Sequence, residues 1–165
     1  MLVRSALVLG VGAVLVACST TDPDSMPLMR KLSARQAQKL VLVWSMAHRV
    51  VASPRCQIGV LGTADGTLIR KLEWTLYVGA EEEAVLVCEK YGLVAFNVPG
   101  TAVVRLCPAF WRLTTLEQVE TLVHETVHVV GAKHDDRGRK FDLVIVQECI
   151  IPYFGERLET GTGPS

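Results

Sequence analysis

Residues 115–131 read TLEQVETLVHETVHVVG, and the rest of the chain can be interpreted outward from this stretch. Its apolar side chains recur at helical spacing, which predicts a helix with one buried face. The predicted buried positions are Leu116, Val119, Val123, Val127 and Val130. Thr115 followed three residues later by Gln118 is the pattern of a capping box, so we expect the helix to begin at Thr115. Gly131 suits its C-terminal end, because glycine readily adopts a left-handed conformation.

The polar face of this predicted helix carries the pattern His124-Glu125-x-x-His128. Residues four apart share a helix face, so both imidazoles can reach one ion. Imidazole is a preferred zinc ligand, and a site with three protein ligands leaves a position for water. Glu125 lies one step round the helix, where it can take a proton from that water. The sequence therefore predicts a Zn²⁺ site, with Glu125 as the catalytic base of peptide-bond hydrolysis.

The third zinc ligand has several candidates downstream of the helix. Gly131 and His134 extend the pattern to HExxHxxGxxH, in which the glycine lets the chain turn back beneath the metal. We therefore expect His134 to be the third ligand. The alternatives are three carboxylates, Asp135, Asp142 and Glu148. A carboxylate that is not a ligand could instead orient one of the histidines.

The N-terminus has the features of an export signal. Arg4 precedes an uncharged run over 5–17, shorter than the about 20 apolar residues that a transmembrane helix needs. The run ends in Leu15-Val-Ala-Cys18, which resembles the lipobox of bacterial lipoproteins. This resemblance implies cleavage before Cys18, lipidation of Cys18 and anchoring to the membrane. By the same resemblance, Ser19 after the cysteine favours the outer membrane in a Gram-negative host, with the domain facing the periplasm or the cell exterior.

The length indicates one domain, and its predicted helices and short strands, described below, place it in the α+β class. We expect a signal peptide (1–17), a polar tether (18–32), the domain (33–155) and a flexible tail (156–165). Lys+Arg and Asp+Glu number 17 each, so the charge predicts no nucleic-acid partner. We expect a monomer whose partners are a peptide or protein substrate and, through the anchor, the membrane.

The remaining elements are predicted from local patterns. Ser33 followed by Gln36 is a capping box, and it predicts a helix that ends before Pro54. Short β-branched or aromatic stretches then predict a small antiparallel or mixed sheet. These stretches are 56–61, 68–78, 84–88, 93–98 and 101–106. A last helix is expected from Lys140 or Phe141 to Phe154.

Two peptidase families resemble parts of this chain. The HExxHxxGxxH pattern resembles the metzincin signature, although the last methionine is Met46 and the methionine turn of that family is absent. The stretch from Cys88 to His128, including Val94-Ala-Phe96 and Cys107-Pro-Ala-Phe-Trp111, resembles the core of the aspzincins. Deuterolysin and the peptidyl-Lys metalloendopeptidases belong to that group. This resemblance implies a small zincin-like domain, with a short sheet packed against the HExxH helix, and zinc endopeptidase activity.

The aspzincin resemblance also carries implications for single residues. Once Cys18 is set aside as the lipidation site, four of the five cysteines remain. An even number in an oxidising compartment indicates two disulfides, and the residues alone leave three pairings open. The resemblance implies the pairs Cys88–Cys107 and Cys56–Cys149. It further implies that the strand at 101–106 binds substrate backbone. His134 stands where that family has an aspartate ligand, and the family's tyrosine is missing, while Glu148 has the spacing of gluzincins such as thermolysin.

A second function from another class stays open at this stage. The protein could be a non-catalytic zincin-fold lipoprotein that binds a partner or has a structural role in the envelope. The missing methionine turn and tyrosine favour this alternative. The presence of Glu125 favours the hydrolase, because a purely structural zinc site does not need a base beside it.

Overall fold

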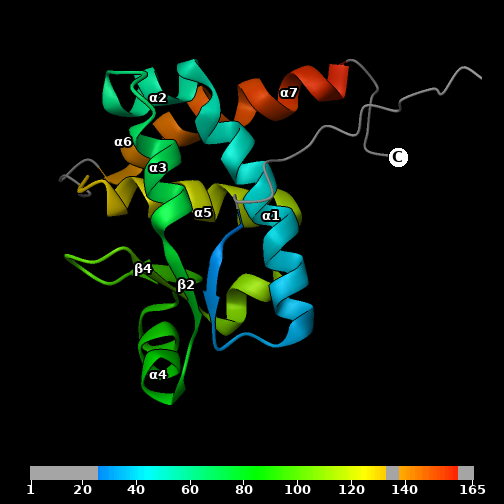
Figure 1. The fold of residues 1–165 in the computed structure, drawn as a ribbon, viewed down its shortest axis with the longest axis vertical. Helices are drawn as coiled ribbons and strands as arrows, with labels where there is room; N and C mark the ends of the chain where they lie inside the picture. Colours follow the sequence, from blue (N-terminus) through cyan, green and yellow to red (C-terminus); the bar gives the residue numbers. More distant parts are fainter. Residues whose placement is uncertain (1–25, 133–137, 160–165) are drawn as a thin grey trace, which may run out of the picture.

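A four-stranded mixed sheet and a layer of helices form the fold, seen in a computed structural model that describes residues 26–132 and 138–159 (Figure 1). The strands are β1 (Leu28–Arg30), β2 (Leu76–Gly79), β3 (Ala95–Asn97) and β4 (Val103–Leu106). Their order is β1-β2-β4-β3, with β1, β2 and β4 parallel and β3 antiparallel to β4. Within the described sheet β1 and β3 are therefore the edges, and β4 is an interior strand. The prediction of an α+β domain with a small mixed sheet is confirmed.

Helices occupy much of the region in which strands are expected. The predictions of strands at 56–61, at 84–88 and in the first part of 68–78 are wrong. These residues form α2 (Pro54–Leu61), α4 (Glu82–Tyr91) and α3 (Thr67–Trp74). Apolar runs this short fit a strand or a buried helix equally well. In α3 the two fully buried side chains, Leu68 and Leu72, lie four residues apart, which is the helical period.

Regular structure extends beyond the predicted domain at both of its ends. Leu28–Arg30, within the segment 18–32 that is expected to be a tether, forms β1 and pairs with β2. At the other end α7 (Ile151–Glu159) continues past position 155, where a tail is expected to begin. The strands predicted at 93–98 and 101–106 are present as β3 and β4.

Capping boxes start both long helices. In α1 (Ala34–Ala52) the cap is Ser33 with Gln36, as predicted. In α5 (Thr115–Val129) the cap is Thr114 with Glu117, so the prediction of Thr115 with Gln118 is wrong by one residue. Gln118 is instead fully buried, and its Nε2 donates to the Phe110 carbonyl at 2.7 Å. A buried side chain with that partner cannot turn back to the helix start.

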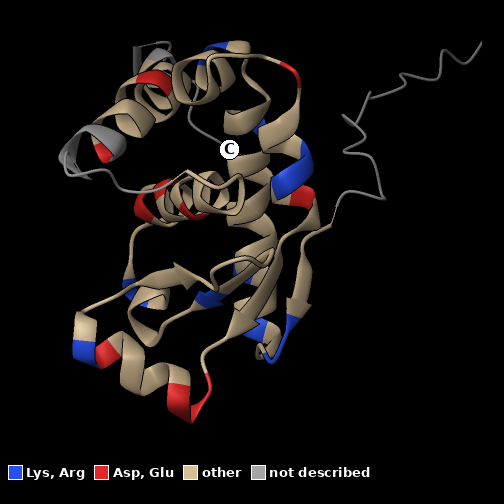
Figure 2. Ribbon diagram, turned by 90° about the vertical axis from the view of Figure 1, so that its left-hand side faces the viewer, with Lys and Arg blue, Asp and Glu red and all other residues tan. Residues whose placement is uncertain are grey.

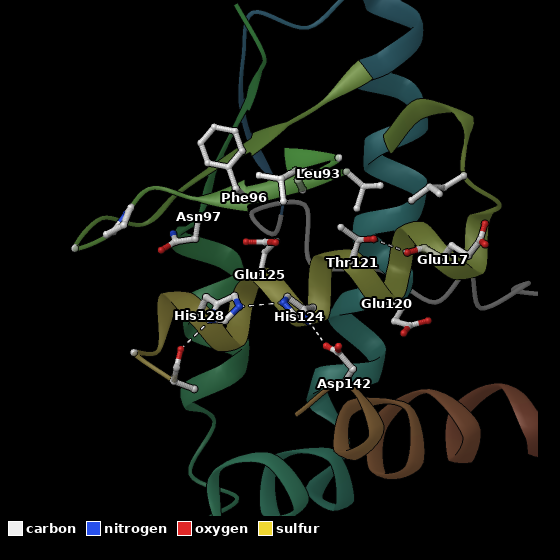
Figure 3. A pocket seen from close by; sticks show the side chains of 18 residues that line it. Leu93, Phe96, Asn97, Glu117, Glu120, Thr121, His124, Glu125, His128 and Asp142 are labelled. Carbon is white, nitrogen blue, oxygen red and sulfur yellow. Dashed lines mark hydrogen bonds and ion pairs between the residues drawn. The ribbon is translucent and has the colours of Figure 1, made fainter. Parts of the chain in front are cut away.

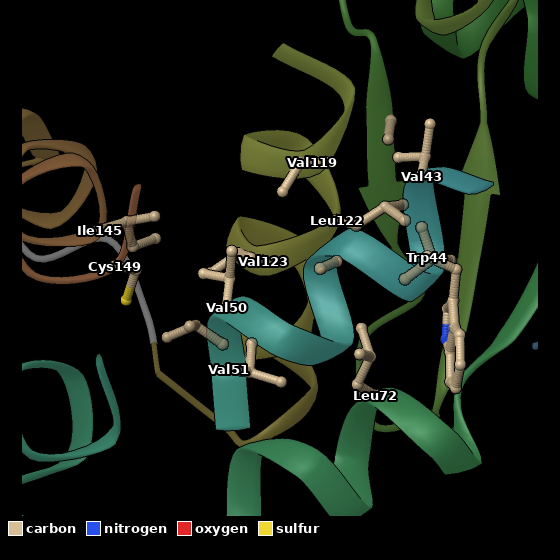
Figure 4. Packing of buried hydrophobic residues seen from close by; sticks show 14 of the residues in the cluster. Val43, Trp44, Val50, Val51, Leu72, Val119, Leu122, Val123, Ile145 and Cys149 are labelled. Atoms are coloured by element: carbon tan, nitrogen blue, oxygen red, sulfur yellow. The ribbon is translucent and has the colours of Figure 1, made fainter. Parts of the chain in front are cut away.

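The faces of α1 and α5 pack together to form the centre of the core (Figure 4). Val43, Val50 and Val51 of α1 are fully buried, as are Val119, Leu122, Val123 and Val127 of α5. Leu116, predicted to be buried, is 44% exposed. The buried stripe of α5 therefore begins one turn later than predicted. In the part of the chain that the structure describes, no helix has the length and apolar character of a membrane span.

The last helix is a continuous helical rod built from three segments. They are α6 (Gly138–Ile145), the π-helical turn η2 (Val146–Ile150) and α7. A disulfide joins Cys149 in this rod to Cys56 in α2, and a second joins Cys88 to Cys107. These are the two pairings that the aspzincin resemblance implies.

Candidate metal centre

A cleft lies between α5 and the edge strand β3, and the HExxH residues open into it (Figure 3). Its volume is about 1040 Å³. Helix α5 contributes His124, Glu125 and His128, while β3 contributes Phe96 and Asn97. The site is built because α5 buries its apolar stripe against α1 and turns the opposite face, with both histidines, toward the cleft.

The two imidazoles point toward each other. The Nε2 atoms of His124 and His128 are 3.0 Å apart. A tetrahedral zinc ion with Zn–N distances near 2.0–2.1 Å would hold two ligand nitrogens about 3.3 Å apart. The prediction that both rings can reach one ion therefore agrees with the geometry to within a few tenths of an ångström.

The other nitrogen of each ring has an acceptor of its own. His128 Nδ1 donates to the Ala132 carbonyl at 2.9 Å, and His124 Nδ1 lies 2.9 Å from Asp142 Oδ1. A carbonyl or an ionised carboxylate cannot donate, so these contacts favour the tautomer with hydrogen on Nδ1. Rings with hydrogen on Nδ1 turn their Nε2 lone pairs toward one another. Both Nε2 atoms are then available to one cation between them, so the donor set fits a metal.

Glu125 is a buried carboxyl group beside this pair. The residue is 6% exposed, and its Oε2 has no hydrogen-bond partner among the described residues. Burial raises the pKa of Glu125 to about 7, and a bond from the Asn97 backbone N–H acts in the opposite direction. A carboxyl group that titrates near neutral pH can both accept and return a proton there.

The four candidates for a third ligand have different positions. Asp142 binds the Nδ1 side of His124, away from the Nε2 atoms, so it orients the ring and is not placed as a ligand. Glu148 pairs with Arg55 at 3.1 Å on the α2 side of the rod, and it does not line the cleft. His134 and Asp135, like the predicted lipidation site Cys18, lie outside the described residues. Among residues 26–132 and 138–159, no three His, Cys, Asp or Glu residues form a group that could hold a metal.

Carboxylates line one wall of the cleft, and the sequence interpretation missed their role. Helix α5 contains glutamates and no lysine or arginine, as the colouring of Figure 2 shows. Glu120 lines the cleft, and its pKa is raised by partial burial and by the charges of Asp142 and Glu117. The signal was available, because Glu120 lies four residues before His124 and so shares its helix face. This wall favours positive charge close to the histidines.

Strand β3, rather than the strand at 101–106, borders the cleft. Strand β4 is hydrogen-bonded to β2 on one side and to β3 on the other, so the expectation that it binds substrate backbone is wrong. On either side of β3, the Val94 carbonyl accepts from the Cys107 N–H and the Val98 N–H donates to the Val103 carbonyl, so both bond toward β4. Backbone groups alternate along a strand, so those of Ala95 and Asn97 point toward the cleft. Sequence patterns could not show this, because they do not give the strand order.

No protein-family model, curated protein or solved structure matches this chain.

Proposed function

We propose that this protein is a zinc-dependent endopeptidase of zincin-like fold, anchored in the cell envelope through lipidated Cys18. The observation that carries the proposal is the facing pair of Nε2 atoms, 3.0 Å apart, beside the buried carboxyl group of Glu125. His124 and His128 would hold Zn²⁺, and His134 is proposed as the third ligand on the sequence pattern. The Nδ1 contacts with Asp142 and Ala132 support this assignment, because ligand histidines commonly have such partners.

The chain's own residues can carry out the proton transfers of peptide hydrolysis. Zinc bound at the site would polarise the scissile carbonyl and increase the acidity of water. Glu125 takes a proton from the attacking water, whose oxygen bonds to the carbonyl carbon. As the C–N bond breaks, Glu125 returns that proton to the leaving amine. Asp142 holds the ring of His124 in place, since its carboxylate accepts from Nδ1.

The edge strand supports a polypeptide as the substrate. The backbone groups of Ala95 and the carbonyl of Asn97 face the cleft, so an extended peptide can add to β3 through them, whereas the Asn97 N–H is already bonded to Glu125. Leu93 and Phe96 line the same wall and offer it apolar contacts. Peptide binding at this edge would bring a scissile bond close to the two histidines on the opposite wall.

A Glu125→Gln variant tests the proposal directly. We expect the purified mature protein to contain zinc and to cleave an unfolded protein such as casein. The Glu125→Gln variant should retain zinc and lose hydrolysis, by on the order of 10²-fold or more, because the proton acceptor is gone. Glu120→Gln, in the same wall and without a proposed proton transfer, is the matched control. Equal cleavage rates for wild type and Glu125→Gln would refute the mechanism.

The non-catalytic alternative has one observation in its favour, since the described residues alone do not complete a three-ligand group. It predicts a protein that holds zinc, or none, and cleaves no peptide in the same assay. A His134→Ala variant separates the two ideas further. Its loss of zinc together with activity would support the hydrolase, whereas unchanged zinc content would remove His134 from the site.

A further inference from the structure

We propose that the Cys56–Cys149 disulfide, with Gly59 beside it, positions Asp142 against His124 and thereby sets the metal affinity of the site. This inference rests on the zinc site proposed above. It assigns to α2, which does not line the cleft, a role in holding the metal.

Helix α2 is attached to the helical rod at two neighbouring residues of the rod, Glu148 and Cys149. Cys149 is bonded to Cys56, and Glu148 accepts from Arg55 Nε at 3.1 Å. Gly59 lies directly against Glu148, because a Cβ atom at Gly59 would be 2.5 Å from Glu148 Cβ and 2.6 Å from its Cγ. The two helices therefore approach each other as closely as a glycine allows.

The helical rod connects this attachment to the metal site, because Asp142 lies in the same rod. Cys149 and Asp142 are seven residues apart in one continuous helical rod, in which α6 runs into η2. At the α-helical rise of 1.5 Å per residue the separation is at most about 10 Å, and the wider π-helical turn η2 makes it somewhat shorter and less than two full turns. Ile145 lies between them, is 1% exposed and belongs to the core cluster near Val123 (Figure 4). Fixing Cys149 therefore fixes the height and rotation of Asp142 relative to α5.

The disulfide is the strongest of the contacts between α2 and the rod. The Arg55–Glu148 ion pair is solvent-exposed, with 61% and 36% of the two side chains accessible, and such pairs contribute little. Asp142 itself is 55% exposed, so burial does not hold its carboxylate on His124. Without the covalent link the end of α6 can shift by the small amount that breaks a 2.9 Å contact.

The second disulfide provides a matched control. Cys88–Cys107 is also buried, but it joins α4 to the end of β4. Helix α4 lies at the end of the molecule opposite α2 and α6 (Figure 1). Its removal loosens the domain without touching the rod that carries Asp142.

The test measures Zn²⁺ affinity of the mature protein by competition with a chelator. We expect Cys56→Ser/Cys149→Ser to weaken zinc binding about 10- to 100-fold, the range known for loss of a histidine's carboxylate partner. Cys88→Ser/Cys107→Ser should change it less than about 3-fold. Asp142→Asn should match the first variant and should add nothing when combined with it, because both remove the same contact. Faster hydrogen exchange in α6 of the metal-free Cys56→Ser/Cys149→Ser protein is the accompanying readout.

Three results would overturn the inference. They are wild-type zinc affinity in the folded Cys56→Ser/Cys149→Ser variant, an equal loss in the Cys88→Ser/Cys107→Ser control, and full multiplication of the effects of the disulfide and of Asp142→Asn. If the serine variant does not fold, Gly59→Ala, which keeps both sulfurs, replaces it and should also weaken zinc binding. Wild-type protein that binds no zinc would refute the proposed function itself, a result distinct from zinc binding that is independent of the disulfide.

Discussion

Replacing Gly59 with alanine should destabilise the protein, although alanine is the better helix former. The added Cβ would lie 2.5 Å from Glu148 Cβ, far inside van der Waals contact. Rotation of the Glu148 side chain cannot relieve this contact, because the position of a Cβ atom is set by the backbone. Helix α2 and the helical rod must therefore move apart. Overpacking of this kind costs about 1–3 kcal/mol, and the higher helix propensity of alanine offsets about 1 kcal/mol.

The expected net loss for Gly59→Ala is therefore up to about 2 kcal/mol in the free energy of unfolding. The control is Gly155→Ala in α7, where the nearest atom to a built Cβ is Ile151 Cγ2 at an ordinary 3.6 Å. That variant should be as stable as wild type or up to about 1 kcal/mol more stable. Urea unfolding of the oxidised proteins, followed by tryptophan fluorescence, measures both. Equal stability of the two alanine variants would refute the close approach of α2 and the rod.

Four further outcomes follow from the fold, the proposed site and the sequence. Thr114→Ala should cost about 1 kcal/mol of stability, measured by urea unfolding, and Thr115→Ala much less, because Thr114 is the cap of α5. The pKa of Glu117 is lowered by its bonds from Thr114, so its stabilising effect is present above the ordinary pKa of a glutamate and is lost as the pH falls through the lowered value. Pairing Glu117→Gln with unfolding at several pH values tests this sign, and a gap from wild type that widened toward acid pH would contradict it. Chelation of zinc should lower the melting temperature reversibly, since a ligand at 100 times its Kd stabilises by about 2.7 kcal/mol. Cys18→Ala should move the protein from the membrane fraction to the soluble exported fraction, and unchanged membrane association would contradict lipidation.

Patterns within one helix were sufficient for the centre of the site. The HExxH spacing placed His124 and His128 on one face, with Glu125 one step round the helix, because 3.6 residues per turn holds wherever the helix packs. The same local reasoning gave the wrong first residue for helix α5. Both Thr114-x-x-Glu117 and Thr115-x-x-Gln118 satisfy a capping box, and the burial of Gln118 against Phe110 distinguishes them. That contact depends on how the chain before α5 folds back.

Short apolar segments were the weakest point of the sequence interpretation. The stretches 56–61 and 84–88 have too few residues to show a period, and they lie inside the longer helices α2 and α4. The edge that faces the cleft was likewise unpredictable. It depends on the order β1-β2-β4-β3, in which β4 is enclosed and β3 is left beside α5.

His124 and Asp142 show most clearly the difference between what the sequence determines and what the tertiary structure determines. Local chemistry is enough to identify His124 as a ligand candidate, since its partner lies one turn away on the same helix. The role of Asp142 required long-range packing, because a carboxylate eighteen positions along the chain could equally be a ligand, a partner of a histidine or a solvated side chain. The position of Asp142 is set by its rod, which is attached to Cys56 across 93 residues of sequence. A periodic pattern predicts which residues share a face of one helix, whereas the contacts between helices form only when the chain folds into its tertiary structure.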